Sequence, residues 1–145
     1  MTPESITDTH LHIIDRARLD YPWLPGVPAL NADWSVETYT DTARKVGIKR
    51  ALHMEVDVAE NRIGDETAHI DTLAARDGSI IAGIIAACRP EHDGFAAEID
   101  CAVAHTRVVG FRRVLHVVPT VCRNRKSSVP TSAVWPRLTC RSTSA

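Results

Sequence analysis

Hydrophobic and polar positions follow two alternating periods over most of the chain. Short apolar runs, typical of strands buried on both faces, are separated by longer stretches in which apolar residues recur every three or four positions. The predicted strands cover residues 6–14, 50–56, 80–87 and 108–115, and the predicted helices cover residues 36–46, 65–76 and 91–105. This strand–helix order predicts an α/β fold with a parallel sheet.

Local signals support two of these helices. Ser35 is a suitable N-cap for the helix over residues 36–46, and Gly47 is placed to end it. Phe95, Ile99 and Val103 recur every four positions, so we expect them to form the inner stripe of the last helix.

Four parallel strands are compatible with an open doubly wound sheet or with part of a closed barrel. The first strand is followed by a histidine-rich turn and not by G-x-G-x-x-G, which disfavours a dinucleotide-binding fold. A complete barrel needs about 250 residues, whereas this chain has 145. We therefore predict the N-terminal half of a (β/α)8 TIM barrel, with about four βα units and an irregular C-terminal tail.

Composition narrows the functional class. Hydrophobic residues make up 44% and charged residues 24% of the chain, and the net charge is -1, which is typical of a globular protein and of neither a nucleic-acid nor a membrane-surface binder. There is no bilayer-spanning apolar run and no secretory signal, so we expect a cytoplasmic protein. The cysteines lack C-x-x-C spacing and are expected to be free thiols. They are Cys88, Cys101, Cys122 and Cys140.

The C-terminal region differs from the rest in charge. All 18 acidic residues lie at or before Asp100, whereas residues 120–145 hold five basic residues and no acidic one. Reading this segment in a shifted frame, with free choice of codons, gives an amphipathic helix, a turn and the start of a strand. We therefore expect residues 1–119 to form a truncated TIM-barrel domain. We expect residues 120–145 to be a disordered tail that results from a frame shift, and a native disordered tail is the alternative.

The strongest chemical signal is the segment Asp8-Thr-His-Leu-His12 in the first predicted strand. Residues two apart on a strand face the same side, so His10 and His12 are expected to project together at the strand end where barrel active sites lie. Two imidazoles placed in this way can bind one divalent metal, and a nearby carboxylate can orient a ring. A pair of surface histidines is the alternative.

Four segments resemble the amidohydrolase superfamily, of the amidohydrolase 2 type. They are similar to the branch of predicted metal-dependent TIM-barrel hydrolases that includes fuconolactonases, sulfomuconolactone hydrolases and pyrone-dicarboxylate lactonases. The segments are Asp8-Thr-His-Leu-His-Ile-Ile-Asp15, Asp20-Tyr-Pro-Trp-Leu24, His53-Met-Glu55-Val and Gly110-Phe-Arg112-Arg113-Val-Leu. The resemblance covers residues 5 to about 119, and the Tyr-Pro-Trp-Leu segment separates this branch from other H-x-H barrels.

This resemblance implies roles for several residues. His10, His12 and Glu55 would be metal ligands, with zinc as the divalent cofactor, although some members of the family work without metal; a loop carboxylate is the alternative for Glu55. Arg112 would fork onto a substrate carboxylate or carbonyl, and Trp23 would form a wall of the pocket. The remaining candidate for substrate binding is His53, for which packing is the alternative. His116 would be a packing residue or a residue at the rim of the site. Arg113 would form a salt bridge at the surface.

The implied activity is metal-assisted hydrolysis of a sugar-acid or muconate-type lactone, a small-molecule substrate. The family's catalytic base is an aspartate at the end of strand eight, a position this chain does not contain, so no catalytic residue is assigned and we expect the chain alone to be inactive. The alternatives are a decarboxylase of the same superfamily, a metal-dependent deoxyribonuclease, and a non-catalytic half-barrel that binds metal or a partner. A homo-oligomer is compatible with the sequence.

Overall fold

A computed structural model describes residues 5–115. Its sheet has four strands, all parallel, in the order β1-β2-β3-β4. The strands are β1 (Ile6–Leu11), β2 (Ile48–Met54), β3 (Ile81–Ala87) and β4 (Val108–Arg112). The α-helices are α1 (Val36–Lys45), α2 (Ile63–Ala74) and α3 (Phe95–Ala104). Short 3-10 turns are η1 (Leu24–Gly26), η2 (Pro28–Leu30) and η3 (Glu60–Arg62).

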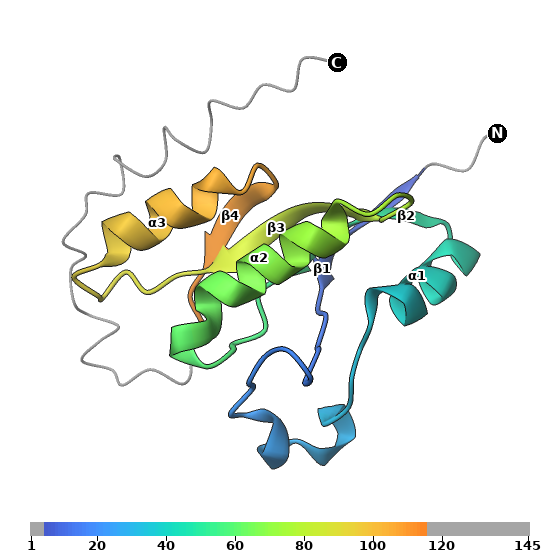
Figure 1. Cartoon of the computed structure of the whole chain (residues 1–145). Coiled ribbons are helices and arrows are strands. Elements are labelled where there is room, and N and C mark those ends of the chain that lie inside the picture. Colours follow the sequence, from blue (N-terminus) through green and yellow to red (C-terminus); the bar gives the residue numbers. More distant parts are fainter. Residues whose placement is uncertain (1–4, 116–145) are drawn as a thin grey trace.

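This topology confirms the predicted α/β half-barrel, because each strand pairs in parallel with the next one along the chain and a helix lies in each connection (Figure 1). The predicted elements all exist, and their ends differ by a few residues. The predicted boundary near residue 119, the tail over residues 120–145 and His116 lie outside the described residues.

The helices cover one face of the sheet. Figure 1 shows α2 crossing in front of the strands, with α1 and α3 on either side of it. The main core forms between strands and the first two helices, where apolar side chains from both layers are almost fully buried. It includes Leu11, Ala51, Ile84 and Val108 from the strands and Val36, Ala43, Ile70 and Leu73 from the helices. The opposite face is less covered, as shown by Val109, which is 52% exposed.

The third helix begins later than predicted. It starts at Phe95 and not at residue 91, because residues 89–94 form turns in which the His92 amide donates to the Arg89 carbonyl and the Phe95 amide donates to the His92 carbonyl. Its inner stripe is confirmed, since Phe95 and Ile99 are buried and Val103 packs against them.

The N-cap of α1 is confirmed and gives a first prediction. Ser35 has extended backbone angles, and its hydroxyl accepts a hydrogen bond from the Thr38 amide at 3.2 Å. Removing such a cap leaves a helix amide without a protein partner. We expect Ser35→Ala to lower the free energy of unfolding by about 1 kcal/mol in urea denaturation, whereas Ser35→Asn should be near neutral. Equal losses in both variants would contradict a capping role.

The long connection between β1 and α1 is closed on itself. Ile14 and Trp34 form an antiparallel bridge in which each amide donates to the other's carbonyl, at 3.1 and 2.9 Å. The Arg16 amide and side chain contact Asp33, and its guanidinium also donates to Asn31. The interior of this connection packs in a second apolar cluster, formed by Ile14, Leu19, Tyr21, Leu24, Val56 and Val58. The connection is therefore a fixed structure beside the ends of β1 and β2.

Two further findings concern the described residues alone. Cys88 is buried and Cys101 is exposed, and both are free thiols, whereas Cys122 and Cys140 lie outside the described residues. Between residues 5 and 115, no helix has the length and apolar character needed to cross a membrane.

Candidate functional site

The two histidines of the H-x-H segment converge at the end of β1. Their Nε2 atoms are 3.1 Å apart, and the rings meet edge to face with centroids 4.7 Å apart. The alternation of the strand turns both side chains away from the helix-covered face, since Leu11 between them is buried in the main core. The sequence prediction that these two imidazoles project together is thus met in the geometry.

A main-chain hydrogen bond defines the ring state of His12. Its Nδ1 lies 2.9 Å from the Met54 carbonyl oxygen, which can only accept, so Nδ1 carries a proton. The neutral ring then has its free lone pair on Nε2, and the contact with His10 requires a proton on the Nε2 of His10. The pKa of His12 is lowered, first by desolvation of the ring and also by His10 and Arg112 nearby. His12 is therefore neutral at neutral pH, as a metal ligand must be.

The histidine pair fits two ligands of a zinc ion. Nitrogens that each lie 2.0–2.1 Å from a tetrahedral zinc are roughly 3.4 Å apart, close to the observed spacing. The Met54 carbonyl on Nδ1 of His12 is the kind of outer partner that zinc-bound histidines have. Asp8 does not contact either ring: its carboxylate accepts from the His10 amide at 2.9 Å and from the Tyr39 hydroxyl. No group of three or more His, Cys, Asp or Glu side chains able to hold a metal occurs within residues 5–115.

Glu55, predicted as a metal ligand, is held elsewhere. The residue is 1% exposed, and its Oε1 lies 3.3 Å from Nε of Arg112 while its Oε2 accepts from the Asp57 amide at 2.9 Å. Arg112 also donates through Nη1 to the Glu55 carbonyl at 3.4 Å. Burial raises the pKa of the Glu55 carboxyl, against the lowering effect of the Asp57 amide and of Arg112. The structure thus places Glu55 in an ion pair with the predicted substrate-binding arginine and does not bring it to the histidine pair as a third ligand.

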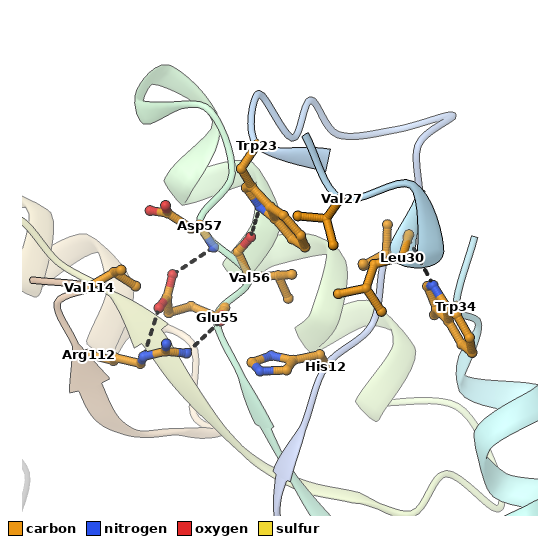
Figure 2. A pocket seen from close by; sticks show the side chains of 11 residues that line it. His12, Trp23, Val27, Leu30, Trp34, Glu55, Val56, Asp57, Arg112 and Val114 are labelled. Carbon is orange, nitrogen blue, oxygen red and sulfur yellow. Dashed lines mark hydrogen bonds and ion pairs between the residues drawn. The ribbon is translucent and has the colours of Figure 1, made fainter. Parts of the chain in front are cut away.

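His12, Glu55, Asp57 and Arg112 line a cavity of about 580 Å³ at the carboxyl ends of the strands (Figure 2). One side of the cavity is polar and is called the floor, and the other side is apolar and is called the wall. The polar residues are His12, Glu55, Asp57 and Arg112, and the others are Ile14, Trp23, Val27, Leu30, Trp34, Val56 and Val114. Trp23 lies in the wall, where its Nε1 donates to the Val56 carbonyl at 2.9 Å. The cavity can hold a small molecule with a carbonyl group near His12 and Arg112.

His53 is not among the residues that line the cavity. It is 1% exposed, and by strand alternation it shares the helix-covered face with Ala51 of the main core. The structure thus buries His53 and leaves it out of the cavity lining, which favours the packing alternative over substrate binding. Arg113 pairs with Glu91, and both side chains are largely buried and not at the surface.

The sequence interpretation missed three contributors to the site. Trp34 lies far along the chain from the H-x-H segment, and only the bridge to Ile14 brings it to the cavity. Asp57 has a positive φ of 48°, a strained conformation for a side chain other than glycine. Arg89 is 4% exposed and its Nη2 lies 3.4 Å from the Asp57 carboxylate. The Tyr-Pro-Trp-Leu segment was a signal for the wall, but no sequence pattern pointed to Asp57 or Arg89.

Comparison with known proteins supports the fold. No protein-family model and no curated protein matches the chain. A solved structure of amidohydrolase 2 from Bifidobacterium longum subsp. infantis matches 79% of this chain and 42% of its own, with a TM-score of 0.57 and 23% identity. An amidohydrolase from Burkholderia multivorans, solved with bound zinc, matches 81% of this chain and 39% of its own, with a TM-score of 0.61 and 23% identity. The chain thus spans about two fifths of the length of these two structures.

Proposed function

We propose that the described half-barrel carries part of the active site of a metal-dependent hydrolase of the amidohydrolase superfamily that opens a lactone. The observation that carries this proposal is the convergence of the His10 and His12 Nε2 atoms, 3.1 Å apart, beside a cavity that also holds Arg112. The resemblance of the fold to two amidohydrolases, one of them with bound zinc, supports the same class. The lactone as substrate rests on the H-x-H and Tyr-Pro-Trp-Leu segments.

Each group has a defined part in this proposal. Zinc, when bound, supplies Lewis-acid polarisation of a carbonyl and a water of lowered pKa. His10 and His12 would hold it, and the Met54 carbonyl keeps the His12 ring in the tautomer whose Nε2 is free. Arg112 donates to the lactone carbonyl oxygen, and Glu55 fixes the direction of the guanidinium through its contact with Nε. Trp23 closes one side of the space in which the ring lies.

A complete catalytic site needs more than these residues supply. Catalytic zinc sites usually have three protein ligands and an open position for water, and residues 5–115 bring together two. We propose that the remaining ligand and the general base come from positions outside the described residues, in keeping with the two-fifths coverage of the solved amidohydrolases.

Zinc binding tests the proposal directly. We expect the 145-residue chain to bind zinc, as measured by competition with a chromophoric chelator. His12→Ala should weaken zinc binding by about 100-fold, because it removes a ligand nitrogen and its Met54 anchor together. His10→Ala should have a similar effect. The matched control is His92→Ala, since this histidine lies near Glu60 and Glu98 and away from the cavity.

One outcome would decide against the proposal: zinc affinity that does not change in either alanine variant would remove its basis. Zinc binding that both variants weaken would support the metal site even without hydrolysis of a lactone in a pH-stat assay, because the general base lies outside the described residues. A zinc-dependent rate that His12→Ala abolishes would support the proposal in full.

A further inference from the structure

The cavity beside the histidine pair has an unusual division between its floor and its wall. One wall comes from the connection between β1 and α1, whose side chains facing the cavity are all apolar or aromatic (Figure 2). They are Ile14, Trp23, Val27, Leu30 and Trp34. The chemistry of this wall limits the body of any ligand that it contacts.

Neither indole of the wall has a free hydrogen-bond donor for a ligand. Trp23 donates its Nε1 proton to the Val56 carbonyl at 2.9 Å, and Trp34 donates its own to the Leu30 carbonyl at 3.2 Å. Because both Nε1 donors are engaged, the two indoles offer only apolar ring atoms to a ligand. The remaining wall residues have no polar side-chain atom, so a hydroxyl group placed against them would lose its water without gaining a partner. Such a loss costs about 1–3 kcal/mol per group.

The wall is also exposed in a way that favours an apolar ligand. Trp34 is 45%, Leu30 43% and Val27 39% exposed. They gather around one cavity, where a ligand can remove their apolar surface from water. The bridge between Ile14 and Trp34 and the contacts of Arg16 with Asp33 and Asn31 hold this surface in place before a ligand arrives. A fixed wall reduces the entropy lost on binding.

The floor favours a neutral head group. The guanidinium of Arg112 is already paired with Glu55, and the second carboxylate of the lining, Asp57, is paired with Arg89. The two contacts of Arg112 use Nε and Nη1, so its Nη2 is not engaged by them. The Nη2 group of Arg112, whose positive charge is already paired with Glu55, suits a neutral carbonyl oxygen as acceptor. A ligand carboxylate would be disfavoured, because it would lie near the carboxylates of Glu55 and Asp57.

We infer that the cavity selects neutral lactones or esters whose body is an apolar or aromatic ring, and discriminates against polyhydroxylated sugar lactones. The carbonyl lies at Arg112 and His12, and the ring packs against the wall that Trp23, Val27, Leu30 and Trp34 form. This inference rests on the proposed function for the orientation of the carbonyl. The selection of the ring depends on the wall alone.

Binding to the whole chain tests this inference without any need for turnover. The probes are dihydrocoumarin, a neutral aromatic lactone, and D-galactono-γ-lactone, a neutral polyhydroxylated one, with affinities measured by titration calorimetry. We expect dihydrocoumarin to bind at least about tenfold more tightly, which corresponds to about 1.4 kcal/mol. Its product, 3-(2-hydroxyphenyl)propionate, should bind more weakly than the lactone, because it carries a carboxylate.

Variants of the wall identify the site. Trp34→Ala should weaken dihydrocoumarin binding by about tenfold, and Trp34→Phe should restore most of it, because an aromatic face remains while the Nε1 donor is lost. The bridge to Ile14 uses main-chain atoms, so the fold of the connection does not depend on the indole. The matched control is Val46→Ala, an apolar residue 62% exposed at the end of α1 and outside the cavity lining.

The outcomes separate this inference from the proposed function. Equal affinity for the two lactones, or no effect of Trp34→Ala, would overturn the inference even if zinc binds at His10 and His12. Selective binding of dihydrocoumarin that Trp34→Ala weakens would support it even if no hydrolysis follows, in which case only the proposed reaction fails.

Discussion

Glu66→Gln is expected to stabilise the protein at alkaline pH by on the order of 3 kcal/mol and to leave it nearly unchanged at pH 4.5. Glu66 lies on α2, is 2% exposed, and accepts a hydrogen bond from the Val56 amide at 2.9 Å. Burial raises the pKa of its carboxyl to about 8, and the nearby carboxylates of Glu55 and Asp57 add to the rise.

The direction follows from proton binding. Between pH 4.5 and 8 the folded protein keeps a proton on Glu66 that the unfolded chain releases, so the free energy of unfolding falls as pH rises through this window. Glutamine keeps an oxygen acceptor for the Val56 amide and carries no titratable proton. Urea denaturation at pH 4.5, 7 and 8.5 measures the effect.

The control for Glu66→Gln is Glu60→Gln. Glu60 lies in η3, just before α2, and its side chain is 68% exposed. A stability that falls between pH 4.5 and 8 equally in the wild type and in Glu66→Gln would show that Glu66 is not the group responsible.

His53→Leu is expected to stabilise the protein most strongly in acid, by on the order of 3 kcal/mol near pH 4.5 and about 1–2 kcal/mol at pH 7. Neither ring nitrogen of His53 has a hydrogen-bond partner among residues 5–115, and burial lowers the pKa of the ring to about 3. Leucine is of similar size and leaves no polar atom without a partner.

The sign of this effect is opposite to that of Glu66. Between pH 6.5 and 3 the unfolded chain binds a proton on His53 that the folded protein does not, so the wild type loses stability as pH falls through this window. Acid unfolding followed by circular dichroism should shift to lower pH in His53→Leu. His92→Gln, at a histidine beside two carboxylates, is the control. A loss of stability in His53→Leu at both pH values would contradict the prediction and indicate that the ring has a partner such as a buried water.

The same variant tests the position of His53 relative to the cavity. Because His53 does not line the cavity, His53→Leu should bind dihydrocoumarin as the wild type does.

Periodicity in the sequence was enough to predict the order of strands and helices. The unbroken apolar run over β3 predicted a strand buried on both faces, and the four-residue spacing of Phe95, Ile99 and Val103 predicted the inner side of α3. The element ends were less predictable, because they depend on single hydrogen bonds such as those that place the turn before Phe95. The alternation of a strand was also enough to place His10 and His12 together.

Other parts of the site depend on contacts between distant residues. A period of two places His53 on one side of β2, but it does not say whether that side faces the helices or the cavity. Glu55 lies where the strand alternation ends, so its ion pair with Arg112 on β4 follows from the sheet and not from the local sequence. Trp34 reaches the cavity only through the bridge to Ile14.

The closed connection between β1 and α1 also bears on how new specificities arise in this fold. Its two ends meet in the bridge between Ile14 and Trp34, and the clasp of Arg16 onto Asp33 and Asn31 lies within the same segment. A segment with close ends can be exchanged at little cost to the scaffold, provided that the replacement keeps the apolar contacts of Leu19, Tyr21 and Leu24 with Val56 and Val58. Within residues 14–34, protein engineers can therefore randomise the side chains that face the cavity, such as Val27, Leu30 and Trp34, while the residues packed against Val56 and Val58 are kept.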